Sequence, residues 1–173
     1  KPVWVSLHLY RAPLANPMNT VFGPLCSRPL LAVIVQDASG TCGVGEIWCN
    51  FPPAGAEYRW NLARDILPAL AVGQNFRNPA HASDDLLCRL HTLGLQAGEA
   101  GPVAQIVAGF DVALWDIVAR RAEKPLFAIL GGGADVPLMN CPQHVASDRP
   151  NSSNIPFRSS DCTDGEIDPA PLG

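Results

Sequence analysis

The stretch PVAQIVAGFDVALWDIVAR, residues 102–120, has the clearest helical periodicity in this chain of 173 residues. Its apolar side chains recur at the three- and four-residue spacing of one helix face, namely Val103, Ile106, Val107, Phe110, Leu114, Ile117 and Val118. Pro102 stands at a starting position, where its missing N–H costs no hydrogen bond. Lys124-Pro125 is expected to end the helix, followed by a short apolar turn at 126–130 and glycines at 131–133. We predict one long core helix here.

Two weaker helical patterns precede this segment. From Ala56 onward, apolar residues share one helix face, and Pro68 is expected to kink this helix because proline removes a backbone hydrogen bond. A second helix is predicted to begin with Ser83 as its N-cap, with Asp84 and Asp85 at the positive end of the helix dipole.

The first third of the chain alternates in the manner of β-strands. Residues 3–10 alternate in polarity, 30–36 form a Val- and Ile-rich run, and 41–49 return after the turn signal Asp37-Ala-Ser-Gly40. Residues 11–28 hold three prolines, two asparagines and a glycine without a period, so they are predicted to form a long loop. A three-stranded antiparallel meander followed by a helical bundle is an α+β fold.

Composition separates a core domain at 1–132 from a segment at 133–173. The chain is 47% hydrophobic and 16% charged, which indicates a buried core, and no apolar run reaches the length of a membrane span. Residues 1–132 carry 10 Lys and Arg against 10 Asp and Glu, whereas 133–173 carry 2 against 6. We predict a packed domain with a poorly structured, coil-like tail. Scattered, balanced basic residues argue against a nucleic-acid partner.

The six cysteines lack C-x-x-C spacing, and a domain of this size needs no covalent cross-links. Most are therefore expected to be free thiols in a cytoplasmic protein. The four histidines lack H-x-x-x-H spacing, and the acidic cluster at 161–168 misses the calcium-loop pattern, so no metal site is predicted. Glu46 is expected to be a structural hydrogen-bond acceptor, and Asp116 with Arg120 a stabilising helical ion pair.

Three segments resemble the N-terminal capping domain of the enolase superfamily, in its mandelate racemase and muconate lactonizing enzyme branch. They are Gly43-Val-Gly-Glu-Ile-Trp48, then Gly109-Phe-Asp-Val-Ala-Leu-Trp-Asp-Ile-Val-Ala-Arg-Arg-Ala122, and Lys124-Pro-Leu-Phe-Ala-Ile-Leu-Gly-Gly132. The resemblance covers roughly residues 2–132. It implies a cap over a (β/α)-barrel whose strand ends remove a proton alpha to a substrate carboxylate and hold the enediolate on Mg²⁺.

That machinery has no counterpart in this chain. Lys1 and Lys124 are its lysines, no Lys-x-Lys occurs, and a barrel typically needs about 250 residues. Residues 133–173 resemble at most a truncated barrel entry at 136–139 followed by coil. No catalytic residue, metal ligand or cofactor site is therefore assigned to the chain. Mg²⁺ is implied for the intact family enzyme, and a small carboxylate substrate is implied when the barrel is present.

The resemblance also indicates two substrate-specificity loops. In the family, the loop between the first two strands reaches over the active site and helps to select the substrate. In that loop, at 11–28, the suited side chains are Met18, Asn19, Val21 and Phe22. A second loop, at 48–53, offers Trp48, Asn50 and Phe51 as a partly apolar lid. The alternatives are a flexible loop packed on its own domain and a strand end closed by two prolines.

Three functions are left open by the sequence. The first is the cap of a mandelate racemase-like enzyme, inactive alone, whose barrel-facing apolar surface includes parts of 126–130 and favours self-association or poor solubility. The second is a non-catalytic interaction module that docks on a separate barrel chain or on a second copy of itself. The third is a stand-alone enzyme that uses an activated cysteine.

Overall fold

The computed structural model describes residues 1–21, 23–52 and 54–133. Two compact units divide the chain. One comprises Lys1–Ala12 and Arg28–Val136, and the other comprises Pro13–Ser27 and Pro137–Gly173. The tail predicted at 133–173 and the acidic cluster at 161–168 thus fall almost entirely outside the described residues.

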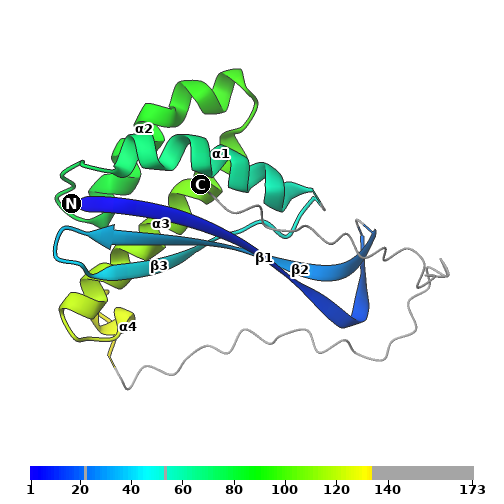
Figure 1. Ribbon diagram of the computed structural model, residues 1–173, viewed down its shortest axis with the longest axis horizontal. Coiled ribbons are helices and arrows are strands. Elements are labelled where there is room, and N and C mark those ends of the chain that lie inside the picture. Colours follow the sequence, from blue (N-terminus) through cyan, green and yellow to red (C-terminus); the bar gives the residue numbers. More distant parts are fainter. Residues whose placement is uncertain (22, 53, 134–173) are drawn as a thin grey trace. The chain divides into compact units, whose positions relative to one another are not determined.

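A three-stranded sheet opens the chain, as predicted. Its strands are β1 (Pro2–Thr20), β2 (Gly23–Asp37) and β3 (Cys42–Ile47), and their order in the sheet is β1-β2-β3 (Figure 1). Strands β2 and β3 pair antiparallel, with Leu31 opposite Ile47 and Val35 opposite Gly43. The turn between them is built by Asp37, whose Oδ1 accepts hydrogen bonds from the backbone N–H groups of Ser39 and Thr41.

The long loop predicted at 11–28 is wrong, because β1 runs to Thr20 and β2 begins at Gly23. Proline is compatible with a strand where its missing N–H faces an unpaired edge. Pro13 and Pro17 lie in β1, which is an edge strand of the sheet. Pro24 lies in the part of β2 that precedes the pairing with β3, which begins at Leu31. The prolines therefore lie in an edge strand or in the part of β2 outside its pairing with β3.

Four helices follow the sheet: α1 (Gly55–Ala71), α2 (Pro79–Gln96), α3 (Ala100–Arg121) and the one-turn α4 (Leu126–Ile129). In Figure 1, α1 and α2 lie along one side of the strands and α3 crosses behind them. Helix α1 continues through Pro68 to Ala71. The indole Nε1–H of Trp60 on α1 donates to the carbonyl oxygen of Leu7 on β1 at 3.5 Å, which links the helix to the sheet.

The start predicted for the second helix is wrong by several residues. Helix α2 begins at Pro79, and its N-cap is Asn78, whose side chain accepts from the backbone N–H of His81 at 2.8 Å. An Asn N-cap followed by proline at the first helical position is a strong start signal, so it takes precedence over Ser83. The Ser83 hydroxyl instead donates to Asp111 Oδ1 at 2.7 Å and ties α2 to α3.

Helix α3 packs directly on β3 because glycines remove the side chains between the two backbones. A Cβ atom on Gly45 would lie 2.0 Å from the carbonyl oxygen of Gly109, and one on Gly43 would lie 2.1 Å from that of Ala113. The Gly43-Val-Gly45 sequence therefore serves packing. The buried core includes Phe110 and Ile106 of α3, both fully buried.

Among the described residues, α3 alone is long and apolar enough to cross a membrane by length and composition. Its apolar face is part of the core cluster formed with β2, β3 and α1. Burial against the sheet thus accounts for its composition.

Candidate functional site

The second predicted loop begins where β3 ends. Beyond Ile47 the strand alternation continues for two residues, so Trp48 is 45% exposed while Cys49 is buried. Asn50 and Phe51 are half-buried. The structure thus brings Trp48, Asn50 and Phe51 together in one short segment, whereas Pro53, the last residue of the predicted loop, lies outside the described residues.

A buried arginine lies beneath this segment. Arg59, on the second turn of α1, is 6% exposed, and its guanidinium lies 5.9 Å from the ring centroid of Trp48. Its Nη1 donates to the Gly55 carbonyl oxygen at 2.9 Å, and its Nε donates to Oε1 of Gln105 on α3 at 2.5 Å. One side chain therefore joins the end of β3, the start of α1 and the first half of α3.

Gly55 provides the space for this arrangement. A Cβ atom there would lie 2.5 Å from Arg59 Nη1 and 3.1 Å from Cδ of Pro52. The Gly55 N–H donates to the Pro52 carbonyl oxygen at 2.7 Å, so the segment that follows Trp48 is closed by a backbone hydrogen bond. The backbone of Gly55 is thus held at both ends: its N–H by Pro52 and its carbonyl oxygen by Arg59.

Cys49 has the properties of a core thiol. Burial raises its pKa, against smaller opposing effects of the Leu31 backbone and the Arg59 charge. A raised pKa disfavours the thiolate, which is the nucleophilic form. Among the described residues Cys42, Cys49 and Cys88 are free, in line with the prediction that most cysteines are free thiols, while Cys26 is disulfide-bonded. Cys49 therefore gives no support to the cysteine-enzyme hypothesis.

The first set of predicted site residues lies at the tip of the β1–β2 hairpin. Met18 and Asn19 are exposed residues of β1, and Val21, in the turn, is 94% exposed. Phe22 lies outside the described residues. The Thr20 hydroxyl donates to the Gly23 carbonyl oxygen at 2.7 Å, across the turn. These side chains are therefore presented by a strand pair and not by a loop.

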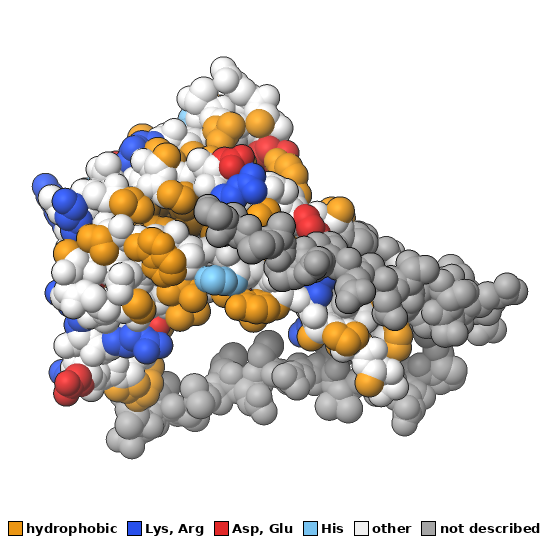
Figure 2. Space-filling model, viewed as in Figure 1, with side chains coloured by type: hydrophobic (Ala, Val, Ile, Leu, Met, Phe, Trp, Pro, Cys, Tyr) orange, Lys and Arg blue, Asp and Glu red, His pale blue; other side chains and the backbone are white. Residues whose placement is uncertain are grey.

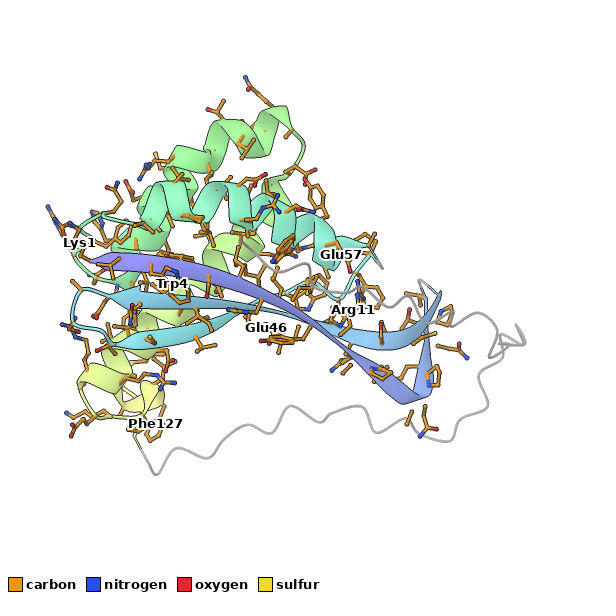
Figure 3. The ribbon with its side chains drawn as sticks, in the orientation of Figure 1. Lys1, Trp4, Arg11, Glu46, Glu57 and Phe127 are labelled. Atoms are coloured by element: carbon orange, nitrogen blue, oxygen red, sulfur yellow. The ribbon has the colours of Figure 1, made fainter. Side chains whose placement is uncertain are left out.

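A bidentate ion pair holds β1 to α1 close to the base of this hairpin. Arg11 Nε donates to Glu57 Oε1 at 2.9 Å and its Nη2 donates to Oε2 at 2.7 Å (Figure 3). Both side chains are less than a third exposed. Paired N–H groups on a carboxylate fix orientation as well as distance. The ion pair therefore fixes β1 at Arg11 relative to the start of α1.

The sheet face opposite α3 carries exposed apolar side chains. Trp4 of β1, Val44 of β3 and Trp48, just beyond the end of β3, are each 45–48% exposed. Figure 2 shows hydrophobic side chains gathered over the strands on this side. Glu46 is exposed in the same row, and its side chain makes no hydrogen bond with any described residue, so the predicted role as a structural acceptor is not seen.

The described residues do not supply a metal site. No group of three or more His, Cys, Asp or Glu side chains within 1–21, 23–52 and 54–133 is arranged to hold an ion. The described residues therefore do not fit the Mg²⁺ ion that the family implies, and we assign no reaction step to these residues. Asp116 has the predicted ion pair with Arg120, at 2.8 Å, and also accepts from the Val44 backbone N–H at the edge of β3.

Sequence reasoning missed Arg59, Gln105 and the Arg11–Glu57 pair. One signal was available for the arginine: it lies four residues before Ala63 and eight before Leu67, on the face of α1 that enters the core. A charged residue at a core position indicates a specific polar role. The partners on β1 and α3 are separated from α1 by 46 residues in each case, and no local pattern connects them.

The meander, the helices and the direct α3–β3 packing define a domain of the type found at the N-terminus of enolase-superfamily proteins. Residues 5–131 match the family model described as "Mandelate racemase / muconate lactonizing enzyme, N-terminal domain". The chain belongs to this family.

Similar proteins agree with the assignment. L-talarate/galactarate dehydratase of Salmonella typhimurium is 29% identical over 138 residues, which cover 76% of this chain and 33% of that protein. A solved mandelate racemase/muconate lactonizing enzyme from Bordetella bronchiseptica is 42% identical, with a TM-score of 0.68 over 76% of this chain and 33% of that one. L-talarate dehydratase from Polaromonas sp. JS666, solved with Mg and L-glucarate, is 30% identical with a TM-score of 0.65, over 78% of this chain and 36% of that chain.

The chain spans about a third of the length of the curated relatives that it matches. The predicted family and fold are confirmed for residues 5–131, the part of the chain that matches the family model.

Proposed function

We propose that this chain is the capping domain of a Mg²⁺-dependent mandelate racemase-like enzyme and is inactive without a barrel. The observation that carries the proposal is the family match over 5–131, in a chain that covers about a third of its relatives. The enzyme abstracts a proton alpha to the carboxylate of a small substrate, in a racemase, dehydratase or cycloisomerase reaction. The barrel supplies the base and the metal ligands.

The two predicted specificity segments have different places in this proposal. Trp48, Asn50 and Phe51 form a lid beside the end of β3, supported by the buried Arg59. Met18, Asn19 and Val21 contact substrate from the tip of the β1–β2 hairpin, and their exposure supports this role. A partly apolar lid excludes water from the reacting carbon and strengthens the electrostatic interactions inside the site.

The docking surface for the barrel includes the end of the family match. Leu126, Phe127 and Leu130 are 37%, 51% and 60% exposed, and no residue of α4 is buried. Figure 3 shows Phe127 on α4, close to where the described residues end. Adjacent exposed apolar side chains of this kind mark an interaction surface. A domain boundary near 132 and a cytoplasmic setting are parts of the same proposal.

A chimera tests this function directly. Residues 5–131 replace the corresponding cap of the Salmonella dehydratase, and the product is loaded with Mg²⁺ and assayed in D₂O for deuterium incorporation at the α-carbon of galactarate and a panel of related hydroxy acids. We expect incorporation by the chimera and none by the 173-residue chain alone. Incorporation by the isolated chain, or none by a folded, Mg²⁺-binding chimera with any acid of the panel, would overturn the proposal.

The alternative is a non-catalytic interaction module, and the exposed row that includes Trp4, Val44 and Trp48 favours it. A module of this class forms a stoichiometric complex with a separate barrel chain or a homo-oligomer. Sedimentation velocity separates the two functions: a defined dimer that buries these tryptophans, together with an inactive chimera, selects the module. A chain that binds a hydrophobic dye and associates without a fixed stoichiometry is the outcome expected of an uncovered cap.

A further inference from the structure

The buried side chain of Arg59 has no explanation in the general packing of the domain. Arg59 is 6% exposed, and a buried guanidinium is costly unless its charge and its N–H groups are satisfied. Within the described residues no carboxylate forms an ion pair with it; its acceptors are a backbone carbonyl oxygen and the side chain of Gln105. The role of this buried charge therefore lies in the groups that the guanidinium contacts.

What it holds is the segment at 48–52. The guanidinium lies over the Trp48 ring, and it binds the carbonyl oxygen of Gly55, whose N–H closes the turn at Pro52. Its third contact, to Gln105, anchors it to α3, the helix that packs on β3 and contributes most to the core. A planar guanidinium makes these contacts in a fixed geometry that a flexible ammonium cannot reproduce.

The space left by Gly55 belongs to the same arrangement. Its missing side chain leaves room for Arg59 Nη1 and for Pro52, which a Cβ atom would approach to 2.5 and 3.1 Å. The space at Gly55 and the contacts of Arg59 thus depend on each other.

We propose that Arg59 is a positioning residue that holds the 48–52 segment in one conformation, and thereby sets the lid over the substrate of the proposed enzyme. The part concerning substrate rests on the proposed function. The part concerning the segment rests on the contacts of Arg59 with Trp48, Gly55 and Gln105 alone.

Amide hydrogen exchange on the 173-residue chain tests the positioning. We expect Arg59→Met to accelerate exchange of the Gly55 amide, which donates to the Pro52 carbonyl oxygen, by about tenfold or more, because the hydrogen bond from Arg59 to the Gly55 carbonyl oxygen is lost. The amides of α3 should change far less. The Trp48 indole resonance should shift in the same variant. Arg64→Met is the matched control, because Arg64 lies on the same helix 4.9 Å from the Trp60 ring but is 46% exposed and does not touch the segment.

Two further variants keep the test decisive if Arg59→Met does not fold. Arg59→Lys keeps the charge and loses the paired geometry, and Gly55→Ala displaces the guanidinium while leaving Arg59 in the sequence. Both should accelerate exchange of the amide at position 55 and shift the Trp48 indole resonance. Wild-type exchange of the amide at position 55 together with an unshifted Trp48 indole resonance, in any folded variant of Arg59 or Gly55, would overturn the inference.

The substrate role has a separate readout in the chimera. Arg59→Met in the cap should raise KM by about tenfold with a smaller change in kcat, since a misplaced lid weakens substrate binding. An unchanged KM together with accelerated exchange would overturn the substrate role and leave the positioning intact. An inactive parent chimera would instead overturn the proposed function.

Discussion

Replacing Gly45 with alanine should destabilise the domain strongly, because β3 and α3 touch backbone to backbone there. The added Cβ would lie 2.0 Å from the Gly109 carbonyl oxygen and 2.9 Å from the Ala113 nitrogen, whereas ordinary contact begins at 3.4 Å. The strand and helix must therefore separate by about 1.4 Å, the difference between 3.4 and 2.0 Å. Neither obstructing atom belongs to a side chain that can rotate away.

The size of the effect follows from overpacking. Forced shifts in a well-packed core cost about 1–3 kcal/mol or more, and rigid backbone on both sides puts Gly45→Ala at about 3 kcal/mol. In a domain of this size that corresponds to a fall in Tm of about 10 °C. Urea unfolding followed by circular dichroism measures the change in the free energy of unfolding.

Gly101→Ala is the control, because Gly101 lies in α3 with nothing within 4 Å of the added Cβ. It should leave stability unchanged or increase it by up to about 1 kcal/mol, since alanine favours the helix. A Gly45→Ala protein within about 0.5 kcal/mol of wild type, which is the range of neutral surface changes, would refute the close approach of β3 and α3.

Three further changes test single contacts. Burial by itself raises the pKa of Asp37, but hydrogen bonds from Ser39 and Thr41 and the nearby Arg121 charge outweigh burial and leave the pKa below 3.8. The ionised carboxylate therefore stabilises the fold above that pH, and this stabilisation is lost as the pH falls through the folded pKa. Urea unfolding at several pH values should show the stability difference between wild type and Asp37→Asn shrinking over that range. Asp116→Ala removes the acceptor of an edge N–H of β3 and should cost about 1 kcal/mol in the free energy of unfolding measured in urea; an unchanged midpoint would contradict this role. Glu57→Gln should cost about 0.5–1 kcal/mol at low salt and less in 1 M NaCl, because its partly exposed ion pair is screened; thermal unfolding at the two salt concentrations measures the difference.

The hairpin illustrates where local signals fail. Prolines at 13, 17 and 24 predict a loop when only the neighbouring residues are considered. In the sheet they lie on an edge strand and on the part of β2 that precedes its pairing with β3. Whether a proline is tolerated in a strand depends on which neighbour that strand has, and the partner is not encoded beside the proline.

The candidate site divides in the same way. Trp48, Asn50 and Phe51 follow from their position after a predicted strand, and the structure places them together. The residues that support them, Arg59 and Gln105, come from two helices and are 46 residues apart. Their contact depends on how α1 and α3 pack, so a sequence pattern indicates only that a charge stands on an apolar helix face.

The strand and helix order and the long core helix α3 follow from the sequence alone, because two-residue and 3.6-residue periodicities are local properties of the chain. The family was indicated separately, by the resemblance of the segments at 43–48, 109–122 and 124–132. Tertiary structure decided the length of the hairpin, the packing role of Gly43 and Gly45, and the Arg59 contacts. Each of these depends on which segments lie side by side in the fold. The physical reason is that backbone contact, edge pairing and burial of a charge are set by neighbours distant in sequence, and a local pattern carries no information about them.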